Sequence, residues 1–472
     1  MGRMGRLIIV GIWVISICFG CGSDVRPKLR RYEENPDGIQ KNPLPEPKRL
    51  FLDNGKVRLG IDLNAGGAIT YLAEGTSGVN MVNNADLGRQ LQTSLYSGPV
   101  PYSVNGKDPV AKWIGLGWNP VQTGDVHNNP AQVISHQQTG NTQLYVKTIP
   151  NIWPLLAEPA DCVMEHWIEL RDNTVHVRSR TTINRADTTQ YEARTQEAPC
   201  VYLNGPYTRI ITYTGLNPFT NDVVNEFKPD HGITDRYATE NWAALLNASG
   251  RGVGLYRANE FRFITAYFGA PGVGTEYDVS SSYMAAVPFE VLDHNRVYEF
   301  EYDLIIGSLD DIRQFAYRQT RPATVPDFRF SGSRARWFYY NTRDTGWPVG
   351  NELNVRWART DTTKASFQIK SPAVYWKATD VPVLEIEAAF STPATTARLS
   401  WRQPGDVDFL ALPTRTLDFP ITGDGVYRTY RISLAGKPGW QDIINQIGLE
   451  PTPGQPARST ATVRIRRIGL GR

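Results

Sequence analysis

Cysteine and histidine are scarce in this chain, which has 4 and 6 of them among 472 residues. Two of the cysteines, Cys18 and Cys21, lie in an apolar N-terminal segment, so only Cys162 and Cys200 remain for the folded part. These two could form a disulfide in an oxidising compartment or stay as buried free thiols. The histidines are scattered and form no HExxH motif, so we expect no metal site and no cofactor.

An excess of charge of either sign is also missing, because 50 Lys and Arg residues balance 47 Asp and Glu residues. Nucleic-acid-binding proteins usually carry a basic surface, so we expect no nucleic-acid partner. Long helical blocks of Leu, Ala, Glu and Lys are scarce. Glycine (41), proline (32), tyrosine (22) and tryptophan (12) are plentiful instead, which favours a β protein with many turns.

The first 21 residues have the pattern of an export signal. Two arginines precede an uncharged run at residues 7–19, which is shorter than the ~20 residues that span a bilayer. The following Gly20-Cys21 resembles the lipobox of bacterial lipoproteins, in which the cysteine is lipidated and becomes the N-terminus. Cys18 departs from that pattern, where leucine is usual. An ordinary secretory signal is the alternative.

The lipobox resemblance implies a lipid anchor at Cys21 and a place in the cell envelope, outside the cytoplasm. Gly22 follows the cysteine, where aspartate is the usual signal for retention in the inner membrane, so we expect the outer membrane, on its periplasmic or surface face. Residues 22–47 are polar and rich in proline, which predicts a disordered tether between the anchor and the folded body.

Two hairpins are predicted in the first half of the chain. Residues 56–63 and 68–72 alternate apolar and polar side chains on either side of an Asn-Ala-Gly-Gly turn. Residues 162–170 and 174–180 do the same around Asp172-Asn173. Strands of this kind recur along most of the chain, so the sequence predicts an all-β protein.

Clear helical periodicity is confined to residues 309–318, which predicts one helix. A proline-marked joint follows at residues 320–327, and short strands resume beyond it. We therefore expect two β domains, residues 48–320 and residues 326–472.

The first domain resembles the galactose-mutarotase-like supersandwich, a family that includes aldose epimerases and the β-domains of polysaccharide lyases and glycoside hydrolases. The resemblance rests on the strings GKVRLGIDLNAGGAITYL with NNADLGRQLQTSLY, EHWIELRDNTVHVRSRTTIN and YEFEYDLIIGSLDDIRQFAY. It covers roughly residues 48–318 and implies an antiparallel supersandwich that handles carbohydrate. The family's enzymes usually pair a histidine with a carboxylate, and the sequence does not place that pair.

The second domain resembles the jelly-roll β-sandwich that is appended to many secreted carbohydrate-active enzymes. The strings that carry this resemblance are GVYRTYRISLAGKPGWQDIINQIGLEP and STATVRIRRIGL. Many such modules bind glycans, whereas others only pack against the catalytic body.

The segment 83–96 is rich in groups that hydrogen-bond sugar hydroxyls. Asn84 and Gln92 supply amides and Arg89 supplies a guanidinium group. We expect these three side chains to bind the substrate.

The segment 113–129 has too many glycines and polar residues for a buried strand. Its candidate ligand-binding residues are Trp118, Asn119, Gln122, Asp125 and His127. Here the tryptophan would stack on a sugar and the polar groups would fix its orientation. The alternative is a glycine-bent loop whose tryptophan fills the core and whose polar groups cap the backbone.

A third set of candidates comprises Glu197, Tyr202 and Glu260. Glu197 lies near a proline and a strand expected to be buried, and partly apolar surroundings would raise its pKa and let it act as a general acid. A salt bridge with Arg194 or a backbone-capping role is the alternative. Tyr202 and Glu260 are further candidates for contact with the substrate.

Two reactions fit these residues. A glycoside hydrolase needs two carboxylates on either side of the scissile bond, and Asp125 and Glu197 would be that pair, with His127 assisting. A polysaccharide lyase needs a base, His127 or Tyr202, and Arg89 would neutralise the uronate carboxylate. We therefore predict an envelope protein that binds and cleaves a polysaccharide or oligosaccharide. A glycan-binding protein without catalysis and a structural envelope lipoprotein are the alternatives.

Overall fold

The computed structural model describes residues 38–75, 77–358, 368–406, 408–410, 412–453 and 461–471. The predicted export signal, the lipidation site Cys21 and the tether up to residue 37 therefore lie outside the described residues. Within the described ranges every pairing between strands is antiparallel, and α1 (Leu309–Arg318) is the one α-helix. The predicted antiparallel all-β class is confirmed.

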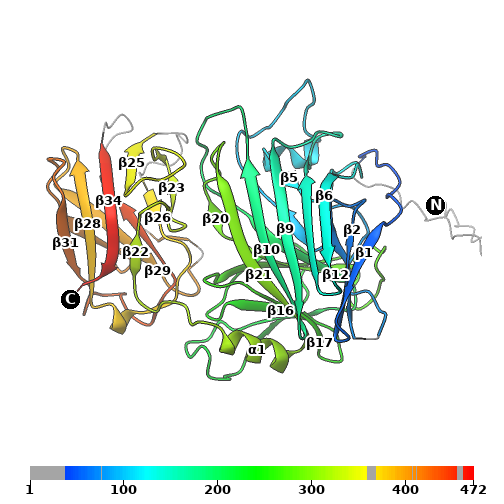
Figure 1. Ribbon diagram of the computed structural model, residues 1–472. Coiled ribbons are helices and arrows are strands. Elements are labelled where there is room, and N and C mark those ends of the chain that lie inside the picture. The colour runs from blue at the N-terminus through cyan, green and yellow to red at the C-terminus, as the bar shows by residue number, and fades with distance from the viewer. Residues whose placement is uncertain are drawn as a thin grey trace, which may run out of the picture. The chain divides into compact units, whose positions relative to one another are not determined.

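Two large sheets form the first part of the fold. In spatial order, the nine-stranded sheet consists of β14 (Asn225–Phe227), β13 (Arg209–Thr212), β16 (Trp242–Leu246), β17 (Arg251–Tyr256), β21 (Val297–Ser308), β10 (Thr174–Ile183), β9 (Cys162–Arg171), β7 (Gln143–Ile149) and β6 (Gln132–Thr139). The seven-stranded sheet consists of β15 (Thr234–Tyr237), β18 (Arg262–Phe268), β19 (Ser281–Ala286), β12 (Glu197–Asn204), β4 (Gln92–Ser94), β5 (Pro120–Val121) and β8 (Asn151–Ile152). A three-stranded sheet of β1 (Arg49–Asp53), β2 (Val57–Asp62) and β3 (Ala68–Glu74) precedes them, and β11 (Arg194–Thr195) pairs with β20 (Phe289–Glu290). The long strands β21, β10 and β9 lie side by side (Figure 1).

The hairpin of β9 and β10 shows how the sequence pattern builds the larger sheet. Buried and partly exposed residues alternate along β9, so one face of the strand enters the core. Asp172 takes a positive φ of 54° in the turn, which Asp tolerates better than most residues. In the resulting register Ile168 pairs with Val177, both in the core, and Trp167 lies opposite Arg178 on the other face.

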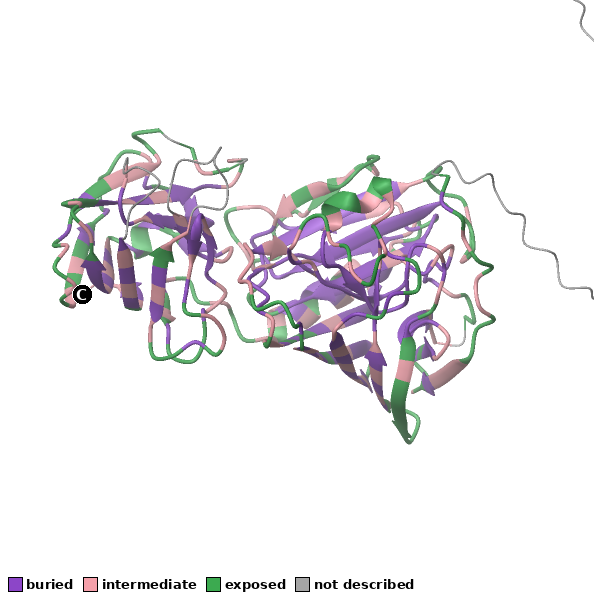
Figure 2. Cartoon of the chain, turned by 90° about the horizontal axis from the view of Figure 1, so that it is seen from above, coloured by how far each residue is buried: buried purple, intermediate pink, exposed green. Residues whose placement is uncertain are grey.

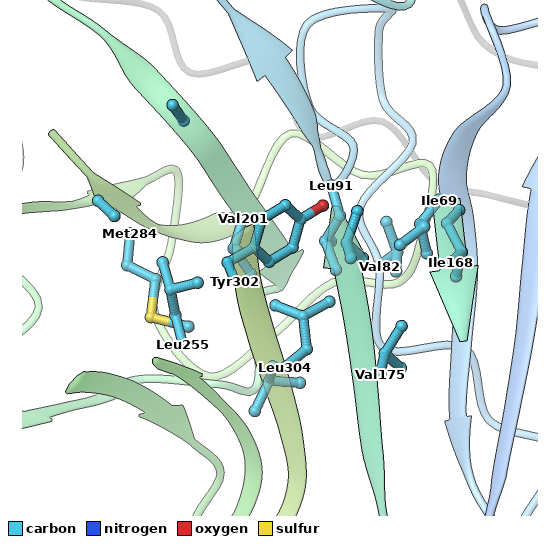
Figure 3. Packing of buried hydrophobic residues seen from close by; sticks show 14 of the residues in the cluster. Ile69, Val82, Leu91, Ile168, Val175, Val201, Leu255, Met284, Tyr302 and Leu304 are labelled. Carbon is cyan, nitrogen blue, oxygen red and sulfur yellow. The ribbon is translucent and has the colours of Figure 1, made fainter. Parts of the chain in front are cut away.

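The nine-stranded and seven-stranded sheets share one hydrophobic core. Figure 3 shows Val201 and Met284 of the seven-stranded sheet together with Leu255, Tyr302 and Leu304 of the nine-stranded sheet. Burial of one such side chain contributes about 1.5–3 kcal/mol, so this cluster holds the two sheets face to face.

Helix α1 packs on the other face of the nine-stranded sheet. It begins at a capping box in which Ser308 and Asp311 satisfy backbone N–H groups of the first turn. Ile312 and Ile305 belong to one buried cluster, separate from the shared core. Gly254 permits the close approach, because a Cβ there would lie 2.6 Å from the Ile312 side chain. The helix predicted from periodicity is confirmed at the same residues.

Two further sheets follow residue 326 and enclose a second hydrophobic core. The six-stranded sheet consists of β24 (Thr342–Arg343), β25 (Leu353–Trp357), β34 (Thr462–Leu470), β28 (Val383–Ser391) and β31 (Arg428–Ser433), with β22 (Asp327–Arg329) also paired to β34. The five-stranded sheet consists of β23 (Phe338–Tyr340), β26 (Gln368–Lys370), β33 (Gln446–Glu450), β29 (Thr396–Arg402) and β30 (Thr416–Pro420). Outside these sheets, β27 (Trp376–Lys377) pairs with β32 (Ile443–Ile444), and two 3₁₀ helices occur at Ala111–Leu116 and Ala378–Asp380.

The two parts of the fold are joined by a buried ion pair within the compact unit Ile39–Arg472. The Arg334 guanidinium is 2.7 Å from Asp293, in the first part, and 2.5 Å from Asp344. Only 4% of Arg334 is exposed. The domain boundary expected at residues 320–326 stays a prediction.

Residues 39–47, which the sequence assigns to the tether, contact the folded body. The Asn42 N–H donates to the His127 carbonyl at 2.8 Å, and the Asn64 side chain donates to the Glu46 carbonyl at 2.8 Å. Ile39 is buried. The described end of the predicted tether is therefore held on the body.

Burial follows the strands. Buried residues are concentrated in the sheets, while exposed residues lie mainly in loops (Figure 2). Cys162 and Cys200 are buried free thiols, which is the second of the two alternatives that the sequence allowed. Among the described residues, none of the helices has both the length and the apolar character needed to cross a membrane.

Candidate functional site

One face of the seven-stranded sheet points away from the shared core, and we call it the outer face. On β12, Val201 and Leu203 are core residues, so strand alternation turns Cys200 and Tyr202 to the outer face. Tyr283 of β19 is paired with Tyr202 and shares that face. The outer face therefore gathers side chains from strands that are distant in sequence.

Glu197 is at the start of β12 and belongs to this group. A bulge in the pairing of β12 with β4 lies between Glu197 and Cys200, and bulges commonly re-aim a side chain. The Tyr283 hydroxyl donates a hydrogen bond of 2.8 Å to Oε1 of Glu197, and Tyr96 also interacts with this carboxylate. Glu197 itself remains partly exposed.

The environment of Glu197 favours proton transfer. Burial raises the pKa of Glu197 above the ordinary glutamate value, and the hydrogen bonds from Tyr283 and Tyr96 offset part of that rise. A carboxyl group with a raised pKa holds its proton closer to neutral pH, so it can donate the proton as well as accept one.

The surrounding tyrosines are hydrogen-bond donors. Burial, and then the negative charge of Glu197, raises the pKa values of Tyr96, Tyr202 and Tyr283 well above the ordinary tyrosine value. A phenol with such a pKa stays protonated at neutral pH. Tyr202 is therefore poorly suited to act as the base of a lyase reaction, which was one of its two predicted roles.

Aromatic rings form a continuous surface beside the carboxylate. The rings of Tyr202 and Phe268 stack with centroids 6.1 Å apart, and those of Tyr202 and Tyr283 are 4.5 Å apart. Tyr202 and Phe268 are partly exposed, whereas Tyr283 is fully buried beneath them. Partly exposed rings can pack against the C–H face of a sugar.

Arg89 borders this aromatic surface. Its guanidinium carbon lies 5.6 Å from the Phe268 ring centroid, and its Nη1 donates to the Ser281 hydroxyl at 3.3 Å. Asp86 pairs with Arg89 at 3.5 Å. The predicted residues Arg89, Glu197 and Tyr202 are thus brought to one face.

Trp118, Asp125 and His127 are placed differently from the expectation. Trp118 is fully buried in the shared core, and its Nε1 donates to Asp161 at 2.7 Å, so no sugar can stack on it. Asp125 is also fully buried and accepts hydrogen bonds from the backbone N–H groups of His127, Asn129 and Ala157. This carboxylate anchors a turn. The placement therefore agrees with the alternative of a structural loop.

His127 and the neighbouring amides also hold the backbone. His127 Nδ1 lies 2.8 Å from the carbonyl oxygen of Gln40, at the N-terminal end of the described chain. Asn119 donates to Ser94 and to the Leu95 carbonyl, and Gln122 donates to the Gly66 carbonyl. Both amides are buried, and their hydrogen bonds go to neighbouring parts of the protein.

The remaining predicted ligand contacts are buried as well. Gln92 faces Cys200 on the outer side of the sheet, but its Oε1 accepts from the N–H and the hydroxyl of Thr123. Asn84 donates to the Thr70 carbonyl at 2.8 Å. Glu260 accepts from the Arg262 N–H at 3.0 Å and pairs with Arg336. These placements give the three residues structural partners and do not support a direct contact with a ligand.

The sequence-based selection missed Tyr96, Tyr283 and Phe268. Tyr96 is the last residue of the segment 83–96, whose amide and guanidinium groups gave the predicted contacts. Tyr283 and Phe268 are on β19 and β18, which look like ordinary buried strands. The sequence did contain a signal for these two residues, because large aromatic residues alternate with small ones along these strands. Such alternation indicates that the face opposite the core also carries large side chains.

A surface pocket of about 530 Å³ lies elsewhere, beside α1, lined in part by Arg313 and Tyr317. The Arg313 guanidinium donates to the Tyr317 hydroxyl at 2.7 Å, and that hydroxyl donates to the buried Glu240 at 3.0 Å. These contacts fasten the helix to the neighbouring loop. Among the described residues, no group of three or more His, Cys, Asp or Glu side chains could hold a metal ion.

No protein-family model and no curated protein matches the sequence. Solved structures similar to it include a galactose mutarotase-like protein from Lactobacillus casei, which is 11% identical with a TM-score of 0.36 and covers 55% of this chain and 100% of its own. A galactose mutarotase-like protein from Clostridium acetobutylicum is 10% identical with a TM-score of 0.34, covering 56% and 96%. An α-galactosidase from Lactobacillus brevis is 8% identical with a TM-score of 0.34, covering 59% and 44%. At TM-scores below 0.5, these similarities support no statement about the ligand or activity of this chain.

Proposed function

We propose that the outer face of the seven-stranded sheet binds a carbohydrate and that Glu197 transfers a proton to or from it. The observation that carries this proposal is the Glu197 carboxyl group, which has a raised pKa and accepts a hydrogen bond from Tyr283 beside the stacked rings of Tyr202 and Phe268. The rings supply a surface for the C–H face of a sugar, and the hydroxyl and guanidinium groups nearby match its polar edge.

A reaction with one acid–base group finds more support than hydrolysis by two carboxylates. The Asp125 carboxylate is committed to its turn, whereas the groups that bind Glu197 are tyrosine hydroxyls. Elimination next to a uronate, or opening of a sugar ring, removes a proton from a carbon or an oxygen and returns one to the oxygen whose C–O bond breaks, and one acid–base group can do both in turn. Glu197 is our candidate for that base.

Incubation of the protein with neutral and uronate-containing polysaccharides tests this function. New carbon–carbon double bonds, detected by ultraviolet absorbance, indicate a lyase, and new reducing ends without that absorbance indicate a hydrolase. Faster equilibration of the anomers of free sugars indicates ring opening. The Tyr202→Ala variant is expected to lose binding, and Trp167→Ala is the matched control, because Trp167 is a partly exposed ring on the nine-stranded sheet.

Each result has a defined meaning. Binding that depends on Tyr202 without any product would favour a glycan-binding protein and refute the catalytic part. Absence of binding to every polysaccharide, or binding that is equal in wild type and Tyr202→Ala, would refute the proposed site.

We also propose export and lipid anchoring at Cys21. The support is the order of two arginines, an apolar run and Gly20-Cys21 in the sequence. Metabolic labelling with a fatty-acid analogue is expected to mark the wild-type protein in the membrane fraction and not Cys21→Ala. Equal labelling of both would contradict the anchor.

A further inference from the structure

The outer face continues beyond Tyr96 to the edge strand β8. The pairings of Ser94 with Val121 and of Ser97 with Trp118 place Tyr96 opposite Asn119. The Trp153 N–H donates to the Asn119 carbonyl at 2.8 Å, so Trp153 lies one strand farther along. Neighbouring strands are ~4.8 Å apart, which separates the Tyr96 and Trp153 backbones by about 10 Å.

Trp153 points to the same side as Glu197. Ile152, the preceding residue, is in the shared core, so strand alternation turns Trp153 outward. Trp153 is partly exposed and belongs to none of the hydrophobic core clusters of the described residues. A large aromatic side chain outside every core cluster is available for a ligand.

Trp113 stands next to Trp153, and its loop borders the Glu197 site. The two indole rings are 6.5 Å apart with an interplanar angle of 70°. Arg194 donates to the Leu116 carbonyl at 2.7 Å and to the Gly115 carbonyl at 2.9 Å. The same guanidinium lies 5.9 Å from the Tyr96 ring, and Tyr96 interacts with Glu197.

A second route connects the tryptophans to the aromatic surface. A Cβ on Gly88 would lie 2.8 Å from the Trp153 ring, so the backbone of this loop touches the indole. The next residue, Arg89, reaches across to the Phe268 ring. Contacts therefore run without a break from Trp113 and Trp153, along the loop, to the rings that flank Glu197.

We propose that Trp113 and Trp153 bind a second part of the same carbohydrate chain, so that the ligand is an oligosaccharide or polysaccharide and not a free monosaccharide. The inference rests on the proposed function of the Glu197 site. Tyr202 lies on β12, three strands from β8, so the stacking surface beside Glu197 and the backbone of Trp153 are about 14 Å apart across the sheet. A chain of several sugar rings can cover that distance, whereas a single ring is too small. The partly exposed indoles supply the stacking surfaces that such a chain needs.

Binding to ladders of oligosaccharides with increasing numbers of sugar units tests this inference. Neutral and uronate ladders from one to eight sugar units are immobilised. A chain of about eight units is longer than the distance between the Glu197 site and Trp153. Binding is compared for wild type, Trp153→Ala, Trp113→Ala and the control Trp167→Ala. Trp167 is matched because it is also partly exposed, contacts another aromatic ring and lies below a cation, Arg178. Thermal unfolding of each variant confirms that it is folded.

Wild type is expected to bind longer oligosaccharides more tightly. Trp153→Ala and Trp113→Ala are expected to weaken binding of the long members by about tenfold, the usual scale of one aromatic contact, and to leave the shortest bound members unchanged. Trp167→Ala is expected to match wild type across the ladder.

Failure of this inference differs from failure of the proposed site. The second binding position is overturned if wild-type affinity does not increase with length, or if it increases as much in the two tryptophan variants as in wild type. In either case, loss of binding in Tyr202→Ala would still support the Glu197 site. If wild type and Tyr202→Ala bind every ladder member equally, both the Glu197 site and the second binding position are refuted.

Discussion

The hydroxyl group of Tyr283 donates a hydrogen bond of 2.8 Å to Oε1 of Glu197, across the neighbouring strands β19 and β12. Tyr283 is fully buried, so its hydroxyl has little freedom to turn away. Burial raises the pKa of Glu197, and this hydrogen bond opposes the rise because it favours the charged form. The pair therefore sets the pH at which Glu197 gains its proton.

The substitution Tyr283→Phe is expected to raise the pKa of Glu197 further. It removes a donor to the carboxylate and leaves the burial of the group unchanged, so the protonated form becomes more favourable. Titration of ¹³C-labelled glutamate side chains by NMR measures the shift, with Glu197→Gln used to assign the signal. A pKa that stays the same or falls in Tyr283→Phe would show that the hydrogen bond does not control Glu197.

Substitutions of Trp118 and Tyr202 are expected to have different effects, one mainly on stability and the other mainly on glycan binding. Trp118→Ala empties a fully buried site and should lower the free energy of unfolding by about 3–5 kcal/mol while the folded fraction keeps its glycan affinity. Tyr202→Ala should weaken binding with a smaller loss of stability, because Tyr202 is partly exposed. Urea unfolding and glycan binding on the same preparations measure both. Loss of glycan binding in Trp118→Ala with little loss of stability would instead indicate that Trp118 contacts the sugar.

His166 is expected to make the fold sensitive to acid. Burial lowers its pKa from 6.5 to about 4. Between these values the unfolded chain binds the proton and the folded chain does not, so the free energy of unfolding falls as pH falls. The full loss for this group is on the order of 3 kcal/mol.

Urea unfolding at neutral and mildly acidic pH measures this effect. His166→Leu removes the titrating group and should flatten the dependence, whereas His136→Gln, at an exposed position of β6, should keep the wild-type slope. An unchanged slope in His166→Leu would assign the acid sensitivity to other groups.

Arg334 is expected to be essential for stability. Its guanidinium neutralises Asp293 and Asp344 in a site where only 4% of Arg334 is exposed. Arg334→Met leaves two buried carboxylates without their cation and should cost about 3–5 kcal/mol. The control Arg398→Met breaks an exposed pair with Asp418 and should cost less than about 1 kcal/mol. Equal losses in urea unfolding would contradict the importance of burial.

Much of the fold could be predicted from local patterns. Alternation over residues 162–170 and 174–180 fixes which face of the β9–β10 hairpin is buried, and helical periodicity over residues 309–318 fixes α1. Both signals lie within a short stretch of chain. The spatial order of strands, such as β12 between β19 and β4, depends on contacts across the whole chain and could not be read locally.

The site could be predicted only in part for the same reason. Glu197 could be selected because a proline and an expected buried strand lie next to it in the sequence, and Tyr202 follows it in the same segment. Tyr283 could not be selected in this way, because its role depends on a pairing with residues more than eighty positions away. Asp125 was predicted to be catalytic because a turn in which a carboxylate accepts hydrogen bonds from backbone N–H groups has the same composition as a polar binding loop.

The most direct test of the account is the ratio of kcat/KM for wild type and Glu197→Gln on the glycan that the wild type converts. The control is Glu165→Gln, which removes a carboxylate that accepts a hydrogen bond from Tyr145 at 2.7 Å on the nine-stranded sheet. We predict a loss of about 100-fold or more in Glu197→Gln, as expected for a general acid–base group, and wild-type activity in Glu165→Gln. Wild-type kcat/KM in Glu197→Gln would contradict the account.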